Sequence, residues 1–168
     1  MDETAARTLI GFVGVCVMGK PMASRLLKAG YPVTVYDLNP APVEALVAKG
    51  AVKAASPTAA AQESDLFVSM VVNDAQLEAI LFEPGDAAAH LKPGATVAGM
   101  STMNRTTVQS IARRLQTLGV HYLDAPVSGG EKGVLAGTLT IMAGGPDELL
   151  ESPRTSASES GNPPFEFC

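Results

Sequence analysis

The sequence contains few of the residues that build disulfide frameworks, metal centres or nucleic-acid surfaces. Its two cysteines are Cys16 and Cys168, and its two histidines, His90 and His121, are far apart in the chain. Neither a disulfide framework nor a metal site is therefore predicted. Lysine and arginine number 12 against 17 aspartates and glutamates, which gives a net charge of −5. This balance argues against a nucleic-acid partner, because such a protein needs a basic face.

Long apolar runs are also absent. No run reaches the length of a membrane span, and the acidic first four residues lack the basic flank and apolar stretch of a signal peptide. We therefore expect a soluble, cytoplasmic protein without membrane partners, although an organellar location stays open. A chain of 168 residues is long enough for one core of ordinary size and too short for two.

What the chain does contain is an alternation of strand and helix patterns. Apolar runs typical of strands cover residues 8–13, 33–37, 51–52, 65–72, 96–100, 120–123 and 138–143. Helical patterns lie between them at residues 18–29, 42–49, 56–62, 75–82 and 102–118. Such alternation predicts an α/β fold of the Rossmann type, a doubly wound and mostly parallel sheet with helices on both faces.

Two segments near the C-terminus differ from this alternation. Residues 127–133 are rich in glycine, and we expect a flexible loop there. Residues 151–168 are rich in serine and proline and show no periodicity, which predicts a disordered tail. The expected organisation is therefore a dinucleotide-binding domain over residues 1–150 followed by that tail.

The first predicted strand ends in a glycine turn, and a helix follows at once. Gly14 and Gly19 occupy the first and third glycine positions of a dinucleotide-binding fingerprint, and Cys16 occupies the middle one. Asp37, which ends the second strand, is placed to accept hydrogen bonds from the ribose hydroxyls. No arginine follows it, so we expect NAD to be preferred over NADP. The alternatives are a glycine turn that only packs and a solvated turn aspartate.

Three stretches together resemble the β-hydroxyacid dehydrogenase family, which includes 3-hydroxyisobutyrate dehydrogenase and 6-phosphogluconate dehydrogenase. They are residues 11–22, residues 100–102, and residues 124–130 with their continuation at 137–142. In order and spacing they are similar to the family's N-terminal domain over residues 8–148. The run from Val71 to Gln76 also resembles the branch that contains threonate dehydrogenases.

The resemblance implies a role for each matching position. In the family, hydride passes between a nicotinamide cofactor and a small hydroxy acid. The implied cofactor-binding residues are Gly14, Cys16, Val17, Met18, Gly19, Asp37, Val71, Val72 and Thr102. The implied substrate-binding residues are Ser128, Gly129 and Gly130, whose donors suit a carboxylate. Without the resemblance, residues 128–130 would be an ordinary loop and residues 101–102 a helix cap.

Two departures from the family pattern weaken the expectation of catalysis. One is Cys16, whose thiol is small enough to weaken cofactor binding without abolishing it. The other concerns the catalytic lysine, which the family carries on a helix beyond this domain, followed by an all-helical domain that we expect to be missing here. Lys132 is the one lysine near the substrate loop, and we expect it to be a solvated loop residue.

We therefore assign no catalytic residue, and we expect this chain alone to turn over poorly or not at all. A non-catalytic nucleotide-binding or interaction module remains the alternative, while a methyltransferase would leave the loop at Ser128 unexplained. The surface on which the helical domain would dock is expected to favour association, for instance with a full-length relative.

Overall fold

The computed structural model describes residues 8–83 and 85–150. The strands are β1 (Ile10–Val13), β2 (Val33–Tyr36), β3 (Val52–Lys53), β4 (Leu66–Ser69), β5 (Thr96–Gly99), β6 (His121–Asp124), β7 (Val127–Ser128) and β8 (Thr140–Ile141). The helices are α1 (Gly19–Lys28), α2 (Pro40–Val47), α3 (Pro57–Ala61), α4 (Asp74–Leu81), the 3-10 turn η1 (Ala87–His90), α5 (Arg105–Thr117) and α6 (Gly130–Ala136).

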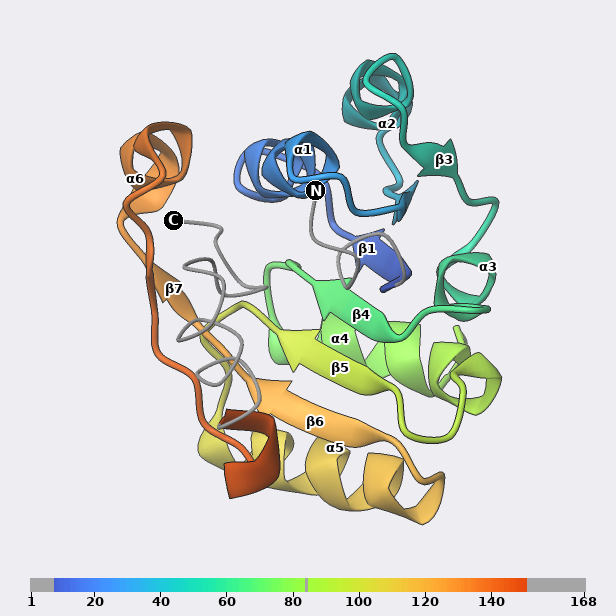
Figure 1. Ribbon diagram of the computed structural model, residues 1–168. Coiled ribbons are helices and arrows are strands. Elements are labelled where there is room, and N and C mark those ends of the chain that lie inside the picture. Colours follow the sequence, from blue (N-terminus) through green and yellow to red (C-terminus); the bar gives the residue numbers. More distant parts are fainter. Residues whose placement is uncertain (1–7, 84, 151–168) are drawn as a thin grey trace.

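Six of the strands form one sheet in the order β3-β2-β1-β4-β5-β6, and every neighbouring pair is parallel (Figure 1). The order runs outward in both directions from β1 and β4, so the chain switches sides of the sheet between these two strands. The predicted Rossmann-type, doubly wound architecture is therefore confirmed.

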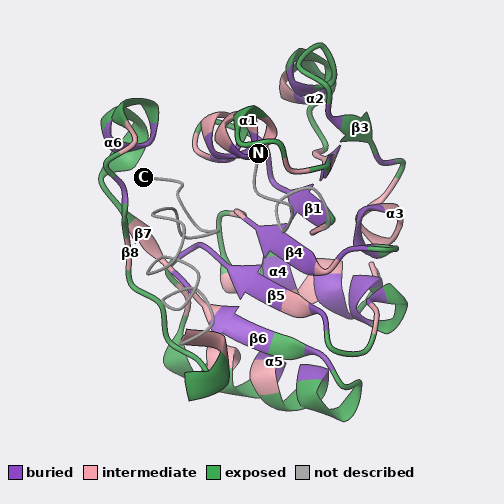
Figure 2. Ribbon diagram, in the orientation of Figure 1, coloured by how far each residue is buried: buried purple, intermediate pink, exposed green. Residues whose placement is uncertain are grey.

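The two faces of the sheet carry separate hydrophobic layers, because successive strand residues point to opposite faces. One layer joins α1, α2 and α6 to the sheet and contains Phe12, Met22 and Val68. The other joins α3, α4 and α5 to the opposite face and contains Phe67 and Ile111. Figure 2 shows the central strands buried on both sides, which explains their nearly continuous apolar sequences.

Two predicted boundaries near the carboxyl ends of the central strands were wrong. The strand predicted over residues 65–72 ends at Ser69, so Val71 and Val72 lie in the following loop. The helix predicted from Thr102 begins at Arg105, because Asn104 is extended and its backbone N–H donates to the Asp74 carboxylate at 3.1 Å. The alternative of a helix cap at residues 101–102 is therefore excluded.

The flexible loop predicted over residues 127–133 was also wrong. Strands β7 and β8 pair antiparallel there, with Val127 opposite Ile141, and α6 follows directly. Val134 and Leu139 anchor this unit in the layer that contains α1. Lys132 is consequently exposed on a helix rather than in a loop. The tail predicted over residues 151–168 lies outside the described residues.

None of the helices within residues 8–83 and 85–150 combines the length and the apolarity that crossing a bilayer requires.

Candidate functional site

The loops that follow β1, β2, β4 and β5 all leave from the same edge of the sheet (Figure 1). The register fixes this arrangement: Val13 is level with Tyr36 on one side and Ser69 on the other, and Ser69 is level with Gly99. The glycine turn, Asp37, the loop at Val71–Val72 and Thr102 therefore meet around the switch between β1 and β4. In open α/β sheets this crevice is where ligands bind.

The glycine turn needs its first and third glycines for different reasons. Gly14 has a φ of +88°, and a Cβ there would overlap the carbonyl oxygen of Met70. Gly19 begins α1, and a Cβ there would overlap the carbonyl oxygen of Gly14. The first glycine thus permits the bend, and the third permits close contact between helix and strand.

Cys16, at the middle position, is exposed. Within the described part of the chain the non-glycine residues with positive φ are Glu63 and Asp86, so Cys16 adopts an ordinary backbone conformation without strain. Its carbonyl accepts a hydrogen bond from the N–H of Lys20 at 3.1 Å. The cysteine is therefore compatible with the turn, and its effect is to add a side chain where a glycine would leave space.

Asp37 is joined to the glycine turn by its carboxylate. Oδ2 accepts from the backbone N–H of Val15 at 2.8 Å, and Oδ1 accepts from that of Asn39 at 2.9 Å. The half-buried carboxylate thus fixes two turns at once, a role that the sequence reasoning missed. Each carboxylate oxygen has a further lone pair, so two acceptor positions remain for other donors.

The start of α1 is left open to a ligand. Its N-cap residue, Met18, provides no side-chain hydrogen bond, and the first turn contains no acidic residue. The backbone N–H groups and the positive end of the helix dipole at this point are therefore not compensated by a carboxylate of α1 itself. A helix of ten residues with such an end favours an anion.

The other predicted cofactor residues line the loops that face this turn. Val71 is half-buried, and its carbonyl accepts a hydrogen bond from the Ser101 hydroxyl. Val72 is 80% exposed, and its N–H donates to Oε1 of Gln76 at 2.9 Å. Thr102 is exposed. An apolar side chain as exposed as Val72, beside the crevice, is available to cover a flat ligand surface.

Ser128, Gly129 and Gly130 are exposed and lie beyond the carboxyl end of β6. Ser128 belongs to β7, where it pairs with Thr140, and Gly130 begins α6. These residues follow the same edge of the sheet as the cofactor candidates, on the side of α6 (Figure 1). Their hydroxyl and backbone N–H groups provide donors without a neighbouring bulky side chain at Gly129 or Gly130.

Two polar residues at the end of β6 were not singled out from the sequence. Oδ1 of Asp124 and the hydroxyl of Tyr122 are buried without a hydrogen-bond partner among the described residues. Burial raises the pKa of Asp124. Burial and the nearby carboxylate of Asp124 raise the pKa of Tyr122 well above its usual range. The sequence signal for Asp124 was an acidic residue at the last position of a strand.

Across the described ranges, no three His, Cys, Asp or Glu side chains are placed to hold a metal ion.

Comparisons with known proteins identify the family of the chain. Residues 9–159 match the family described as the NAD binding domain of 6-phosphogluconate dehydrogenase. The chain is 43% identical to an NAD-dependent L-serine dehydrogenase of Pseudomonas aeruginosa, over 86% of this chain and 49% of that protein. It is 38% identical to an L-threonate dehydrogenase of Cupriavidus necator, over 83% of this chain and 47% of that protein.

A solved structure gives the same result for the fold. The 3-hydroxyisobutyrate dehydrogenase of Mycobacterium tuberculosis, whose structure is described with L-serine, superposes with a TM-score of 0.84 at 29% identity. The match covers 95% of this chain and 51% of that one. The chain thus spans about half the length of the curated relatives it matches. It belongs to the family of NAD binding domains of 6-phosphogluconate dehydrogenase.

Proposed function

We propose that this chain is the cofactor-binding half of an NAD-preferring dehydrogenase that acts on a small hydroxy acid of the 3-hydroxyacid type. The observation that carries the proposal is the glycine turn, held against Asp37 by the Val15 hydrogen bond at 2.8 Å, beside the open start of α1. Family membership supports the oxidoreductase class, and the relatives named above act on L-serine and L-threonate.

The residues around the turn fit a dinucleotide. Side chains at Gly14 and Gly19 would overlap backbone oxygens, so the shape of the turn requires glycine at these two positions. In the proposal the start of α1 holds the pyrophosphate, and the free lone pairs of Asp37 accept the ribose hydroxyls. Val71 and Val72 cover the adenosine side, and Thr102 lies toward the nicotinamide. The bound cofactor would supply the hydride acceptor or donor.

The substrate carboxylate is assigned to the Ser128 hydroxyl and the N–H groups of Gly129 and Gly130. Oxidation of a hydroxyl also needs a group that takes its proton. We assign that group to no residue of this chain, because Lys132 is exposed on α6 and belongs to no matching motif. The proposal is therefore that the 168-residue chain binds cofactor without turning over substrate.

Cofactor binding is tested by titrating the chain with NADH and NADPH and following nicotinamide fluorescence. We expect NADH to bind more tightly than NADPH, because the Asp37 carboxylate repels a 2′-phosphate. Asp37→Ala is expected to weaken NADH binding by about tenfold, the scale of a lost charged hydrogen bond. The exposed Asp147 provides the matched control, and Asp147→Ala should leave the affinity within about twofold. A folded chain that binds no NADH at millimolar concentration would contradict the proposal.

A non-catalytic nucleotide-binding module is the second candidate, and the thiol of Cys16 in the middle glycine position favours it. An assay of the chain with NAD and L-serine or L-threonate bears on both functions. Cofactor binding without turnover agrees with either a half-enzyme or a module. Turnover that then appears when the C-terminal half of a relative is added in trans supports the half-enzyme, and the absence of such turnover supports the module. Robust turnover by the chain alone would contradict both.

A further inference from the structure

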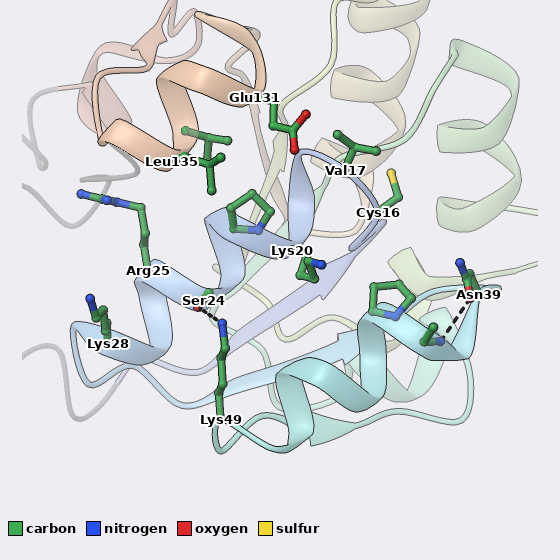
Figure 3. Close-up of a pocket in the computed structure, with 14 residues that line it drawn as sticks. Cys16, Val17, Lys20, Ser24, Arg25, Lys28, Asn39, Lys49, Glu131 and Leu135 are labelled. Atoms are coloured by element: carbon green, nitrogen blue, oxygen red, sulfur yellow. Dashed lines mark hydrogen bonds between the residues drawn. The ribbon is translucent and has the colours of Figure 1, made fainter.

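A groove of about 760 Å³ runs along the outer face of α1, between α2 and α6 (Figure 3). It begins beside Cys16 and Val17 and continues away from the glycine turn along the helix. Its floor is formed by α1, and its apolar walls include Pro42 of α2 and the exposed Leu135 of α6. Cys16 and Val17 are the lining residues that the groove shares with the assigned cofactor positions, and none of the residues assigned to the ribose, the nicotinamide or the substrate lines it.

The groove gathers positive charge in an acidic chain. Lys20, Arg25, Lys28 and Lys49 line it together with one carboxylate, that of Glu131. These are 4 of the 12 lysines and arginines in a chain whose net charge is −5. Within the described residues, the ion pair observed joins Lys92 to Asp65, so the four cations of the groove repel one another without a paired carboxylate. A bound anion would relieve that repulsion.

Helix stability does not account for the whole arrangement. Arg25 and Lys28 stand in the last turn of α1, where the dipole favours cations. Lys20 stands in the first turn, where the dipole disfavours them. The guanidinium of Arg25 packs against Gly137 at the end of α6, where a Cβ would overlap it. The position of Arg25 is therefore explained by the fold, whereas that of Lys20 favours an anion on this face.

The centre of the groove holds a pair of donors. Nζ of Lys49 donates to Oγ of Ser24 at 3.0 Å (Figure 3). Because the Ser24 oxygen accepts from lysine, its own hydroxyl hydrogen is free to donate, and Lys49 keeps two further N–H groups. Lys20 and Lys28 lie one turn before and one turn after Ser24 on α1, so the donors form a stripe about 12 Å long at 1.5 Å per residue.

We propose that this groove is a binding site for a small phosphorylated molecule, which adjoins the cofactor crevice at Cys16 and Val17 and extends away from it along α1. The phosphate is held by Ser24 and Lys49 and flanked by Lys20 and Lys28, and the apolar part of the ligand lies against Pro42 and the exposed Leu135. Phosphate fits better than a carboxylate because its three terminal oxygens and higher charge match several donors on different sides.

The test is calorimetric titration of the 168-residue chain with inorganic pyrophosphate, alone and with saturating NADH. We expect pyrophosphate to bind in both cases. Lys49→Gln and Lys28→Gln are each expected to weaken binding by about tenfold, as for the loss of one charge-assisted contact. Lys53→Gln removes the same charge from an exposed lysine of β3 outside the groove, and we expect less than a twofold effect. Thermal unfolding of each variant verifies that it is folded.

Three results would overturn the proposal: no binding at millimolar pyrophosphate, an equal loss in Lys53→Gln, or complete displacement of pyrophosphate by NADH. The last result would assign the anion to the glycine turn. The groove proposal and the cofactor assignment can be contradicted independently of each other. A chain that binds pyrophosphate with the groove pattern but binds no NADH would support the groove and contradict the cofactor assignment.

Discussion

At the scale of single residues, Cys16 determines how closely a cofactor can approach the turn. Its backbone is unstrained and its side chain is exposed, so the substitution costs the fold little. A thiol nevertheless occupies space that a glycine would leave to a pyrophosphate, whose oxygens need direct access to backbone N–H groups. Binding, rather than stability, is the property that this residue should affect.

Cys16→Gly is therefore expected to tighten NADH binding by about fivefold, which corresponds to roughly 1 kcal/mol. Fluorescence titration of the variant and the original chain measures the change. Cys16→Ser keeps a side chain of similar size and serves as the control, with an affinity expected to stay close to that of the original chain. An unchanged or weaker affinity in Cys16→Gly would show that the thiol does not obstruct the cofactor.

Residue patterns predicted part of this site and missed another part. The positions of Gly14, Gly19 and Asp37 followed from their spacing, because a glycine turn and an acid at the end of the second strand need only local sequence to be noticed. The bond from Val15 to Asp37 spans 22 positions, and the unpaired oxygen of Asp124 depends on what is packed around it. Such tertiary features have no local signature in the chain.

At the scale of elements, short capping side chains fix where several helices begin. Ser56 accepts from the N–H of Ala59 at 3.0 Å, and Asn73 accepts from that of Gln76 at 3.0 Å. Both helices begin directly after these residues. A side-chain oxygen that satisfies a free N–H of the first turn stabilises the helix start.

Ser56→Ala is expected to lower the free energy of unfolding by about 1 kcal/mol, the usual cost of a lost N-cap. Urea denaturation measures the difference. Ser110 is exposed on α5, so Ser110→Ala makes the same chemical change without removing a cap, and its effect should be neutral or slightly stabilising. Equal effects of the two substitutions would mean that the Ser56 bond adds nothing to stability.

Elements whose shape depends on distant contacts were predicted less well. The glycines of residues 127–133 indicated a loop, but Val134 and Leu139 pack into the core beside α1 and thereby stabilise α6. Similarly, Asp74 binds the N–H of Asn104 and delays the start of α5 to Arg105. In both cases a tertiary contact outweighed the local preference.

At the scale of the whole molecule, the stability of the fold should depend on the ionisation of Asp124. Burial raises the pKa of its carboxyl above the ordinary value of 3.8, so the folded state favours the protonated form. The contribution of Asp124 to stability is then fully present below pH 3.8 and is lost as the pH rises through the folded-state pKa.

Asp124→Asn removes this ionisation. We expect the free energy of unfolding of the variant, relative to that of the original chain, to be higher at pH 7 than at pH 3.5. The gain should be no more than about 1 kcal/mol, because the side chain is only partly buried. Urea denaturation at the two pH values measures the difference between variant and original chain. Asp147→Asn, at an exposed position, is the matched control and should show no comparable change. If the stability difference between the variant and the original chain is the same at pH 3.5 and pH 7, this account is contradicted.

The position of β1 also has a consequence for how the chain folds. This strand pairs with β2, and it pairs equally with β4, where Ile10 is level with Leu66. The centre of the sheet therefore cannot close until a chain segment of more than fifty residues has been brought together, and such long-range closure slows folding. During synthesis, β1 would remain without one of its two neighbours until Ser69 had left the ribosome, and its unpaired edge would be exposed to aggregation during that time.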